Sequence, residues 1–173
     1  MTIKVIEEAK KATKEEVIIG KIDWSDSPFL EIKELGKNSV GGFGEHLYNQ
    51  YQKQIQINQS KVVRVEHDVV VGQNKKVEVK TAFQNKAGGF FFNQIRYHLP
   101  KDHKRAGEQK DWTHLAFVFI RPYSVEIWEC ERPSDPERHF KWNNDWSWNG
   151  KNEGKGNKLC TDTWRKAYEH SYK

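Results

Sequence analysis

Two acids and a lysine lie close together in one short stretch of the chain, which runs from His67 to Lys80 and reads HDVVVGQNKKVEVK. Glu78 and Lys80 are two residues apart among β-branched neighbours, so an extended strand would place both side chains on one face. Carboxylates are oxygen ligands that suit Mg²⁺, and a lysine beside them could orient or deprotonate an attacking water or stabilise developing negative charge. The spacing predicts metal-assisted chemistry at a phosphate.

A β-hairpin is predicted for the same stretch. The run Val69–Val71 precedes the lysine strand, and Gly72–Asn74 between them is good turn material. Directly opposed residues of an antiparallel pair point to one face, so the loop length decides where Asp68 lies. A three-residue loop or an equivalent bulge places Asp68 with Glu78 and Lys80, whereas a two-residue turn does not. We predict this three-residue loop or bulge, an odd number of residues, with Asn74 in the left-handed region.

Helical and extended segments are predicted at the start of the chain. Residues 3–15 follow helical spacing, and residues 16–24 suit a short strand or extended arm. Ser27 resembles an N-cap and Pro28 a first helical residue, which predicts a helix over 28–35 that Gly36 ends.

A further helix is predicted directly before the hairpin. A glycine-rich entry at 38–44 leads into a helix over about 43–55. Its apolar residues recur at steps of four and are expected to face the core. They are Phe43, Leu47, Tyr51 and Ile55. Glu45 lies on this helix and adds a third carboxylate to the candidate site.

After the hairpin, the pattern predicts a helix over 90–99, which Pro100 ends. Its buried side is expected to carry Phe91, Ile95 and Leu99. Gln94 lies next to that side. The continuous apolar run 115–120 is typical of a central strand buried on both faces, and 125–128 is expected to pair back onto it.

The C-terminal part, residues 131–160, is rich in Asn, Gly, Lys and Trp and is predicted to be irregular, followed by a helix capped by Thr161 or Asp162. Its tryptophans are interpreted mainly as packing anchors. Basic residues here and in the polar loop 98–110 are the candidates for contact with phosphates. They are Lys101, Lys104, Arg105, Lys141, Lys151 and Lys155.

Composition narrows the class of protein. The chain has 173 residues and a formal net charge of +5, which suits one domain and favours a polyanionic partner. It has two cysteines, no apolar stretch of membrane-spanning length and no signal-peptide core, so we expect a cytoplasmic protein without a membrane partner. The histidine and cysteine spacings match no zinc pattern, and no serine-hydrolase motif is present.

The order of acids and lysine resembles one known family. Glu45 on a helix, then Asp68, then Glu78-Val79-Lys80 resembles the PD-(D/E)xK phosphodiesterase superfamily, over about residues 40–130. His67 stands where the motif name has proline, a departure that the superfamily often shows.

The resemblance implies a single nuclease domain with an α/β fold, a central mixed β-sheet flanked by helices that is restriction-endonuclease-like. The core would span about 40–130, with an N-terminal arm at 1–39 and a C-terminal region at 131–173. Mg²⁺, or Mn²⁺ in its place, would be bound by Asp68, Glu78, the Val79 carbonyl and Glu45. Lys80 would be the catalytic lysine. Gln94 falls where several branches carry a functional glutamine.

The expected activity is Mg²⁺-dependent hydrolysis of DNA phosphodiester bonds by an endonuclease, first of the type II restriction type. Cutting both strands would need a homodimer or a partner subunit. A nuclease of DNA repair, recombination or phage type that recognises DNA structure is the alternative enzyme. A nucleic-acid-binding subunit without catalysis is the alternative outside enzymes.

Overall fold

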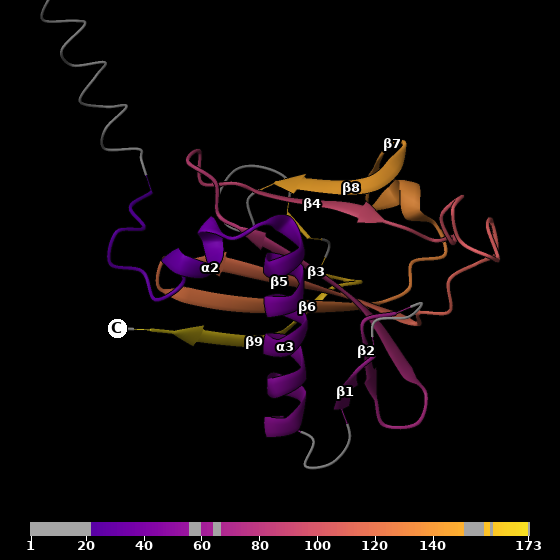
Figure 1. Ribbon diagram of the computed structural model, residues 1–173, viewed down its shortest axis with the longest axis horizontal. Helices are drawn as coiled ribbons and strands as arrows, with labels where there is room; N and C mark the ends of the chain where they lie inside the picture. Colours follow the sequence, from indigo (N-terminus) through magenta and orange to yellow (C-terminus); the bar gives the residue numbers. More distant parts are fainter. Residues whose placement is uncertain (1–21, 56–59, 64–66, 151–157, 160, 173) are drawn as a thin grey trace, which may run out of the picture.

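Six strands form one mixed sheet in the computed structural model, which describes residues 22–55, 60–63, 67–150, 158–159 and 161–172 (Figure 1). The strands lie in the order β1, β2, β3, β5, β6, β9. Their bounds are β1 Ser60–Val62, β2 Val69–Val71, β3 Lys75–Phe83, β5 His114–Arg121, β6 Ser124–Glu131 and β9 Arg165–Ser171. β3 and β5 are parallel, and every other neighbouring pair is antiparallel. The expected mixed sheet is therefore present.

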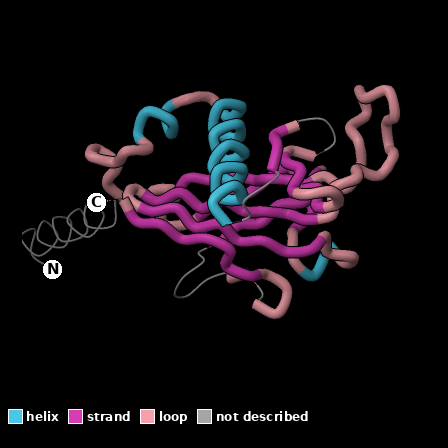
Figure 2. Tube along the Cα trace, turned by 90° about the horizontal axis from the view of Figure 1, so that it is seen from below, coloured by secondary structure: helices cyan, strands magenta, loops and turns pink. Residues whose placement is uncertain are grey.

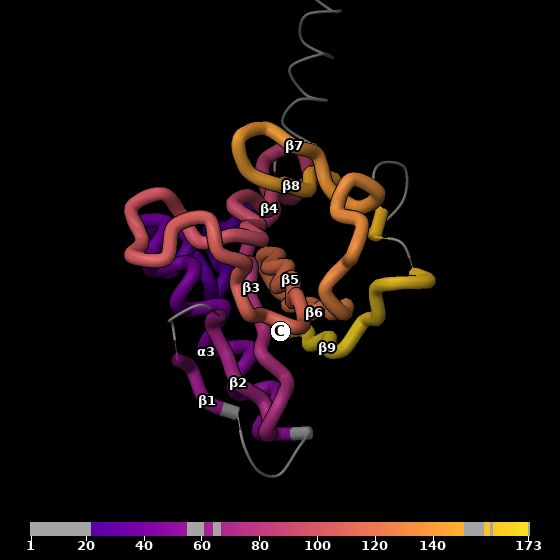
Figure 3. Tube along the Cα trace, turned by 90° about the vertical axis from the view of Figure 1, so that its right-hand side faces the viewer, coloured from indigo at the N-terminus to yellow at the C-terminus, as the bar shows by residue number. Residues whose placement is uncertain are grey.

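Different layers cover the two faces of this sheet. The helices α2 (Leu30–Glu34) and α3 (Lys37–Ile55) lie on one face (Figure 2). On the other face lies a second sheet in the order β4, β8, β7 (Figure 3). Its strands are β4 Phe90–Ile95, β8 Asp145–Gly150 and β7 Lys141–Asn143, and a short 3₁₀ turn, η1 Pro136–Arg138, precedes β7. The helices of the described chain thus flank the central sheet on one face, not on both.

Strand β5 separates two cores, because its successive side chains point to opposite faces. The β5 side chains of one face are Ala116, Val118 and Ile120. They pack in the core beneath α3, together with Tyr48. Those of the other face pack against β4 and β8, where Phe92 and Phe117 stack with ring centroids 4.1 Å apart. The predicted central strand at 115–120 is confirmed, as is the return strand at 125–128.

The hairpin has the predicted odd loop. Val69 pairs with Val77 and Val71 with Lys75, which leaves the three residues Gly72–Asn74 between the strands. The left-handed residue is Gly72, with φ of 61°, and not the asparagine as predicted. Glycine takes this position at no steric cost, because it has no Cβ.

The helix predicted over 90–99 is wrong, because this segment forms strand β4. Phe90 and Phe92 are 1% exposed, whereas Phe91 between them is 52% exposed, which is the alternation of a strand. Pairing with β8 breaks between Phe92 and Ile95, at Gln94 with φ of 54°. A run of aromatic residues is compatible with either state, and the distant partner β8 decides for the strand.

Two further predictions for the C-terminal part are also wrong. Residues 131–160 contain β7 and β8, and the predicted final helix is strand β9, which pairs along the free edge of β6. The small sheet and the sheet edge supply hydrogen-bond partners that no local pattern reveals.

The helix before the hairpin is confirmed but begins earlier than predicted. The glycine-rich entry lies inside α3, which starts at Lys37. Gly44 faces β3 so closely that a Cβ built on it would lie 1.7 Å from Thr81 Oγ1. Glycine at this point therefore lets the helix and the strand approach and places the neighbouring Glu45 near the sheet.

The helix predicted at 28–35 is confirmed in shorter form as α2. Its N-cap is Phe29 and not Ser27 as predicted, because Ser27 Oγ accepts a hydrogen bond from the Phe29 amide at 3.1 Å, before the helix begins. The segment predicted as a helix at 3–15, and residues 16–21 of the predicted arm, lie outside the described residues. Among the described helices, α3 included, none combines the length and the hydrophobicity needed to cross a bilayer.

Candidate active site

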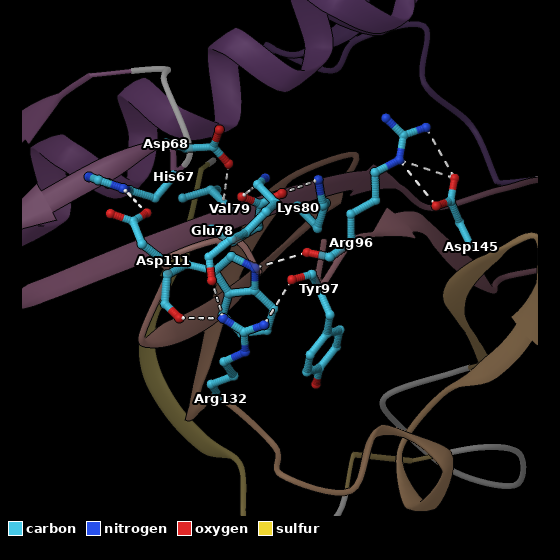
Figure 4. Close-up of polar contacts among 12 residues, drawn as sticks. His67, Asp68, Glu78, Val79, Lys80, Arg96, Tyr97, Asp111, Arg132 and Asp145 are labelled. Atoms are coloured by element: carbon cyan, nitrogen blue, oxygen red, sulfur yellow. Dashed lines mark hydrogen bonds and ion pairs between the residues drawn. The ribbon is translucent and has the colours of Figure 1, made fainter. Parts of the chain in front are cut away.

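Strand β3 carries the acid and the lysine of the candidate site. Glu78 is 3% exposed and is held by two lysines (Figure 4). Lys80 Nζ lies 2.9 Å from Glu78 Oε1, and Lys110 Nζ lies 2.7 Å from Glu78 Oε2. Glu78 and Lys80 therefore share a face of the sheet, as their spacing predicted.

Asp68 lies at the edge of β3, just before β2 begins. Its amide donates to the Val77 carbonyl at 2.9 Å, and its Oδ2 accepts a hydrogen bond from the Val79 amide at 2.7 Å. These two bonds bracket Glu78, which is the residue between Val77 and Val79. Figure 4 shows the bond from Asp68 to Val79. The odd loop and this irregular strand end together bring Asp68 beside Glu78.

Glu45 approaches the site from the opposite layer. It lies on α3 and lines one groove with Asp68 and Lys80. The groove has a volume of about 820 Å³ and follows the second half of β3 between the α2–α3 region and β4. Gln94 lines its far wall, from a strand and not from the predicted helix. The structure thus brings these four residues to one groove along β3. Glu78 does not line the groove but contacts it through its ion pair with Lys80.

Burial and neighbouring acids together raise the pKa of Asp68 to about 6. Burial is the main cause, and the neighbouring charge of Glu78 is the next. The charges of Glu45 and Glu78 act in the same direction, while Lys80 acts against them. The ionised form of Asp68 is therefore less favourable than that of an exposed aspartate, and an approaching positive charge would favour it.

Burial also opposes ionisation of Glu78, but the charges of Lys80 and Lys110 outweigh it, so the pKa of Glu78 lies below its ordinary value. For Lys80, burial favours the neutral amine, yet the charges of Glu78 and Asp68 outweigh it and raise the pKa of Lys80. Lys80 is thus an ammonium group at neutral pH. It can donate hydrogen bonds and stabilise negative charge, but it is not available as a base.

The oxygen donors fit a divalent cation in part. Asp68 is a half-buried carboxylate and Glu78 a buried one. The N–H and C=O of one strand residue point to the same edge, so the Val79 carbonyl faces the side of Asp68. Among the described residues, no three His, Cys, Asp or Glu side chains come close enough to form a complete ligand set. Mg²⁺ usually binds through one or two carboxylates together with waters and substrate phosphates, so two carboxylates and a carbonyl suit it.

Lys110 is a site residue that sequence reasoning assigned only to an exposed loop. Arg132 fixes its position, because the guanidinium donates to the carbonyls of Lys110, Trp112 and Tyr97 (Figure 4). The same guanidinium lies 4.3 Å from the Trp112 ring centroid. No spacing in the sequence links Lys110 to Glu78, and only the fold brings them together.

Asp111 contacts His67 and Lys76 next to Asp68. His67 Nδ1 lies 2.8 Å from Asp111 Oδ1, and Lys76 Nζ lies 2.6 Å from Asp111 Oδ2. Asp111 directly follows Lys110, so two consecutive residues hold the two ends of the site: one binds Glu78 and the other binds the neighbour of Asp68 (Figure 4).

The basic residues proposed for phosphate contact are dispersed. Lys101, Lys104 and Arg105 lie exposed in the loop before β5, and Lys141 is exposed on β7. Lys151 and Lys155 lie outside the described residues. The packing role expected for the tryptophans holds for Trp148 and Trp164, which are buried, but not for Trp142, which is 63% exposed.

Comparison of the chain with models of protein families, with curated proteins and with solved structures finds no significant match.

Proposed function

We propose that this protein is a Mg²⁺-dependent deoxyribonuclease that hydrolyses DNA phosphodiester bonds with a site like that of the PD-(D/E)xK superfamily. The observation that carries the proposal is the arrangement of Asp68 and the charged Lys80 along one groove, with the buried Glu78 2.9 Å from Lys80. Structural acids in a protein interior are usually neutralised, but Asp68 is held beside Glu78 with a raised pKa. Such an arrangement favours a bound cation.

Asp68, Glu78 and the Val79 carbonyl would hold the cation, and Glu45 would contact it through water. A bound Mg²⁺ supplies charge neutralisation at the phosphate and a lower pKa for water. Lys80 would donate to a non-bridging phosphate oxygen and orient the attacking water. In the hydrolysis, the water oxygen forms a new bond to phosphorus, one ester P–O bond breaks, and the departing alkoxide takes a proton from solvent. The proton of the attacking water passes to solvent, because Lys80 is already protonated.

One chain supplies one such site and so makes one nick. A homodimer or a partner subunit would therefore cut both strands, as expected of a restriction-type enzyme, while a nuclease that recognises DNA structure can act on one strand.

Incubation of supercoiled plasmid DNA with the protein and Mg²⁺ tests the proposal. We expect conversion to nicked or linear DNA by the wild-type protein, none in EDTA, and none by Asp68→Ala. Lys53→Ala is the matched control, because Lys53 is exposed near the C-terminal end of α3. Equal cleavage by Asp68→Ala, or no cleavage of any plasmid, phage or branched DNA by the wild type, would refute the proposal.

A further inference from the structure

One aromatic ring of β4 faces the groove and not the core. Phe90 and Phe92 are 1% exposed, but Phe91 is 52% exposed and lines the groove that contains Asp68 and Lys80. Fold stability gives no reason for a half-exposed phenylalanine here, because the core beneath β4 is filled by its neighbours. A planar apolar ring beside a candidate phosphate-binding site is suited to stacking against a nucleobase.

Hydrogen-bonding groups continue along the same wall. Asn93 and Gln94 are exposed and line the groove after Phe91. The bulge between Phe92 and Ile95, where Gln94 has φ of 54°, breaks the strand alternation and leaves these two successive amides on the exposed side. Side-chain amides offer both donors and acceptors to base edges.

The opposite wall is basic. Lys33 and Lys37 come from α2 and the start of α3, and Asn38 follows them. Lys80 adds a third ammonium group on the groove floor. These cations can contact the phosphates of a strand whose bases face Phe91, and the acids Glu45 and Asp68 are gathered at the cation-binding end.

We propose that the groove binds an unpaired DNA strand, with one base stacked on Phe91, its edge hydrogen-bonded by Asn93 or Gln94, and the backbone along Lys33 and Lys37. This inference rests on the proposed nuclease function and specifies its substrate as DNA with a single-stranded segment. A ring can stack only on the face of a base, and intact duplex DNA presents base edges in its grooves but not base faces. The inference thus favours structure-specific cleavage over recognition of an intact duplex site.

Fluorescence anisotropy in EDTA measures the binding without cleavage. The probes are a labelled mixed-sequence oligonucleotide and the same strand annealed to its complement. We expect tighter binding of the single strand, and Phe91→Ala should weaken that binding by about 5- to 100-fold while duplex binding stays unchanged. Phe91→Leu keeps apolar bulk without a ring and should behave like Phe91→Ala, whereas Phe91→Trp should restore binding. Tyr123→Ala is the matched control, because Tyr123 is 45% exposed outside this groove.

Tighter binding of the duplex, equal loss of both probes in Phe91→Ala, or full binding by Phe91→Leu would overturn the inference. The plasmid assay separates this result from the proposed activity. Strand binding that depends on the Phe91 ring, without any metal-dependent cleavage, would refute the nuclease and retain the strand-binding groove. Metal-dependent cleavage together with strand binding that does not need the Phe91 ring would retain the nuclease and refute the strand-binding groove.

Discussion

Two buried glutamates of the central sheet both contact cations, but one of them also has other acids beside it. Glu78 on β3 is 3% exposed, and Glu129 on β6 is 1% exposed. Glu129 Oε1 accepts from the Tyr48 hydroxyl at 2.5 Å and the Gln52 amide at 2.9 Å. Its Oε2 accepts from Lys75 at 2.9 Å and Arg165 at 3.0 Å. The Glu129 cluster therefore surrounds one acid with four donors.

Glu78 also has cationic partners, but its cluster contains further acids. Two lysines neutralise Glu78, yet Asp68 stands beside it and Glu45 adds a third negative charge. Burial lowers the stability of the ionised form in both clusters, but donors outweigh it at Glu129 and do not at Asp68. A buried acid with four donors holds layers together, whereas under the proposed function the acids beside the groove would bind a cation.

The strongest test of this contrast is Asp68→Asn. Loss of a charged ligand should reduce cleavage by at least about 100-fold, comparable with removal of a transition-state donor. The free energy of unfolding should stay constant or rise, because the amide still accepts from Val79 and no longer repels Glu78. Plasmid cleavage and urea unfolding measure the two effects, and a large loss of stability would place Asp68 among structural acids.

Glu129→Gln should show the reverse pattern. The amide cannot replace the charge that Lys75 and Arg165 contact, so we expect a loss of about 2 kcal/mol in the free energy of unfolding. Arg165 is 75% exposed and contributes little of this, because water screens it. Cleavage per folded molecule should be unchanged, and a selective loss of activity at full stability would contradict the structural assignment.

Lys110→Gln tests whether Glu78 needs its second lysine for position. Lys110 orients a candidate ligand, and loss of such supporting groups typically reduces metal affinity or activity about 10- to 100-fold. We expect half-maximal cleavage at a higher Mg²⁺ concentration and a loss of about 1–3 kcal/mol in the free energy of unfolding, because the buried Glu78 loses one of its two charged partners. Lys110→Arg should recover part of both. Lys104→Gln, in the same loop but exposed, is the control.

Gly44→Ala should disturb both clusters, because α3 carries Glu45 towards one and Tyr48 towards the other. The added Cβ would meet Thr81 at 1.7 Å, so the helix must shift. Overpacking of this kind destabilises by about 1–3 kcal/mol. A double-mutant cycle with Thr81→Ala should recover part of this loss. Additive effects in that cycle would show that the contact is not responsible.

The smallest expected effect is in the pH dependence of stability. The pKa of Glu129 lies below its ordinary value of 4.5, because the donors around it outweigh burial. Its contribution to stability is therefore complete above pH 4.5 and is lost as the pH falls through the lower, folded-state pKa. The stability difference between wild type and Glu129→Gln should shrink below about pH 4.5 in urea titrations. A constant difference down to pH 3 would mean that the carboxylate charge is not what stabilises the cluster.

Local patterns in the sequence determined the hairpin and the central strands. Alternation placed Glu78 and Lys80 on one face, and the loop length brought Asp68 to them, because strand geometry has a fixed period of two. The apolar run 115–120 predicted a strand buried on both faces, and β5 is such a strand. These features depend on neighbours only a few residues apart.

Tertiary structure decided the rest. Phe90–Ile95 and Arg165–Ser171 are strands because β8 and β6 offer them hydrogen-bond partners, which helical spacing in the sequence could not reveal. The contact between Lys110 and Glu78 depends on Arg132 binding three carbonyls. The groove itself forms only where α3, β3 and β4 meet. A single segment can specify its own periodicity, but contacts between distant segments are selected by the packing of the whole chain.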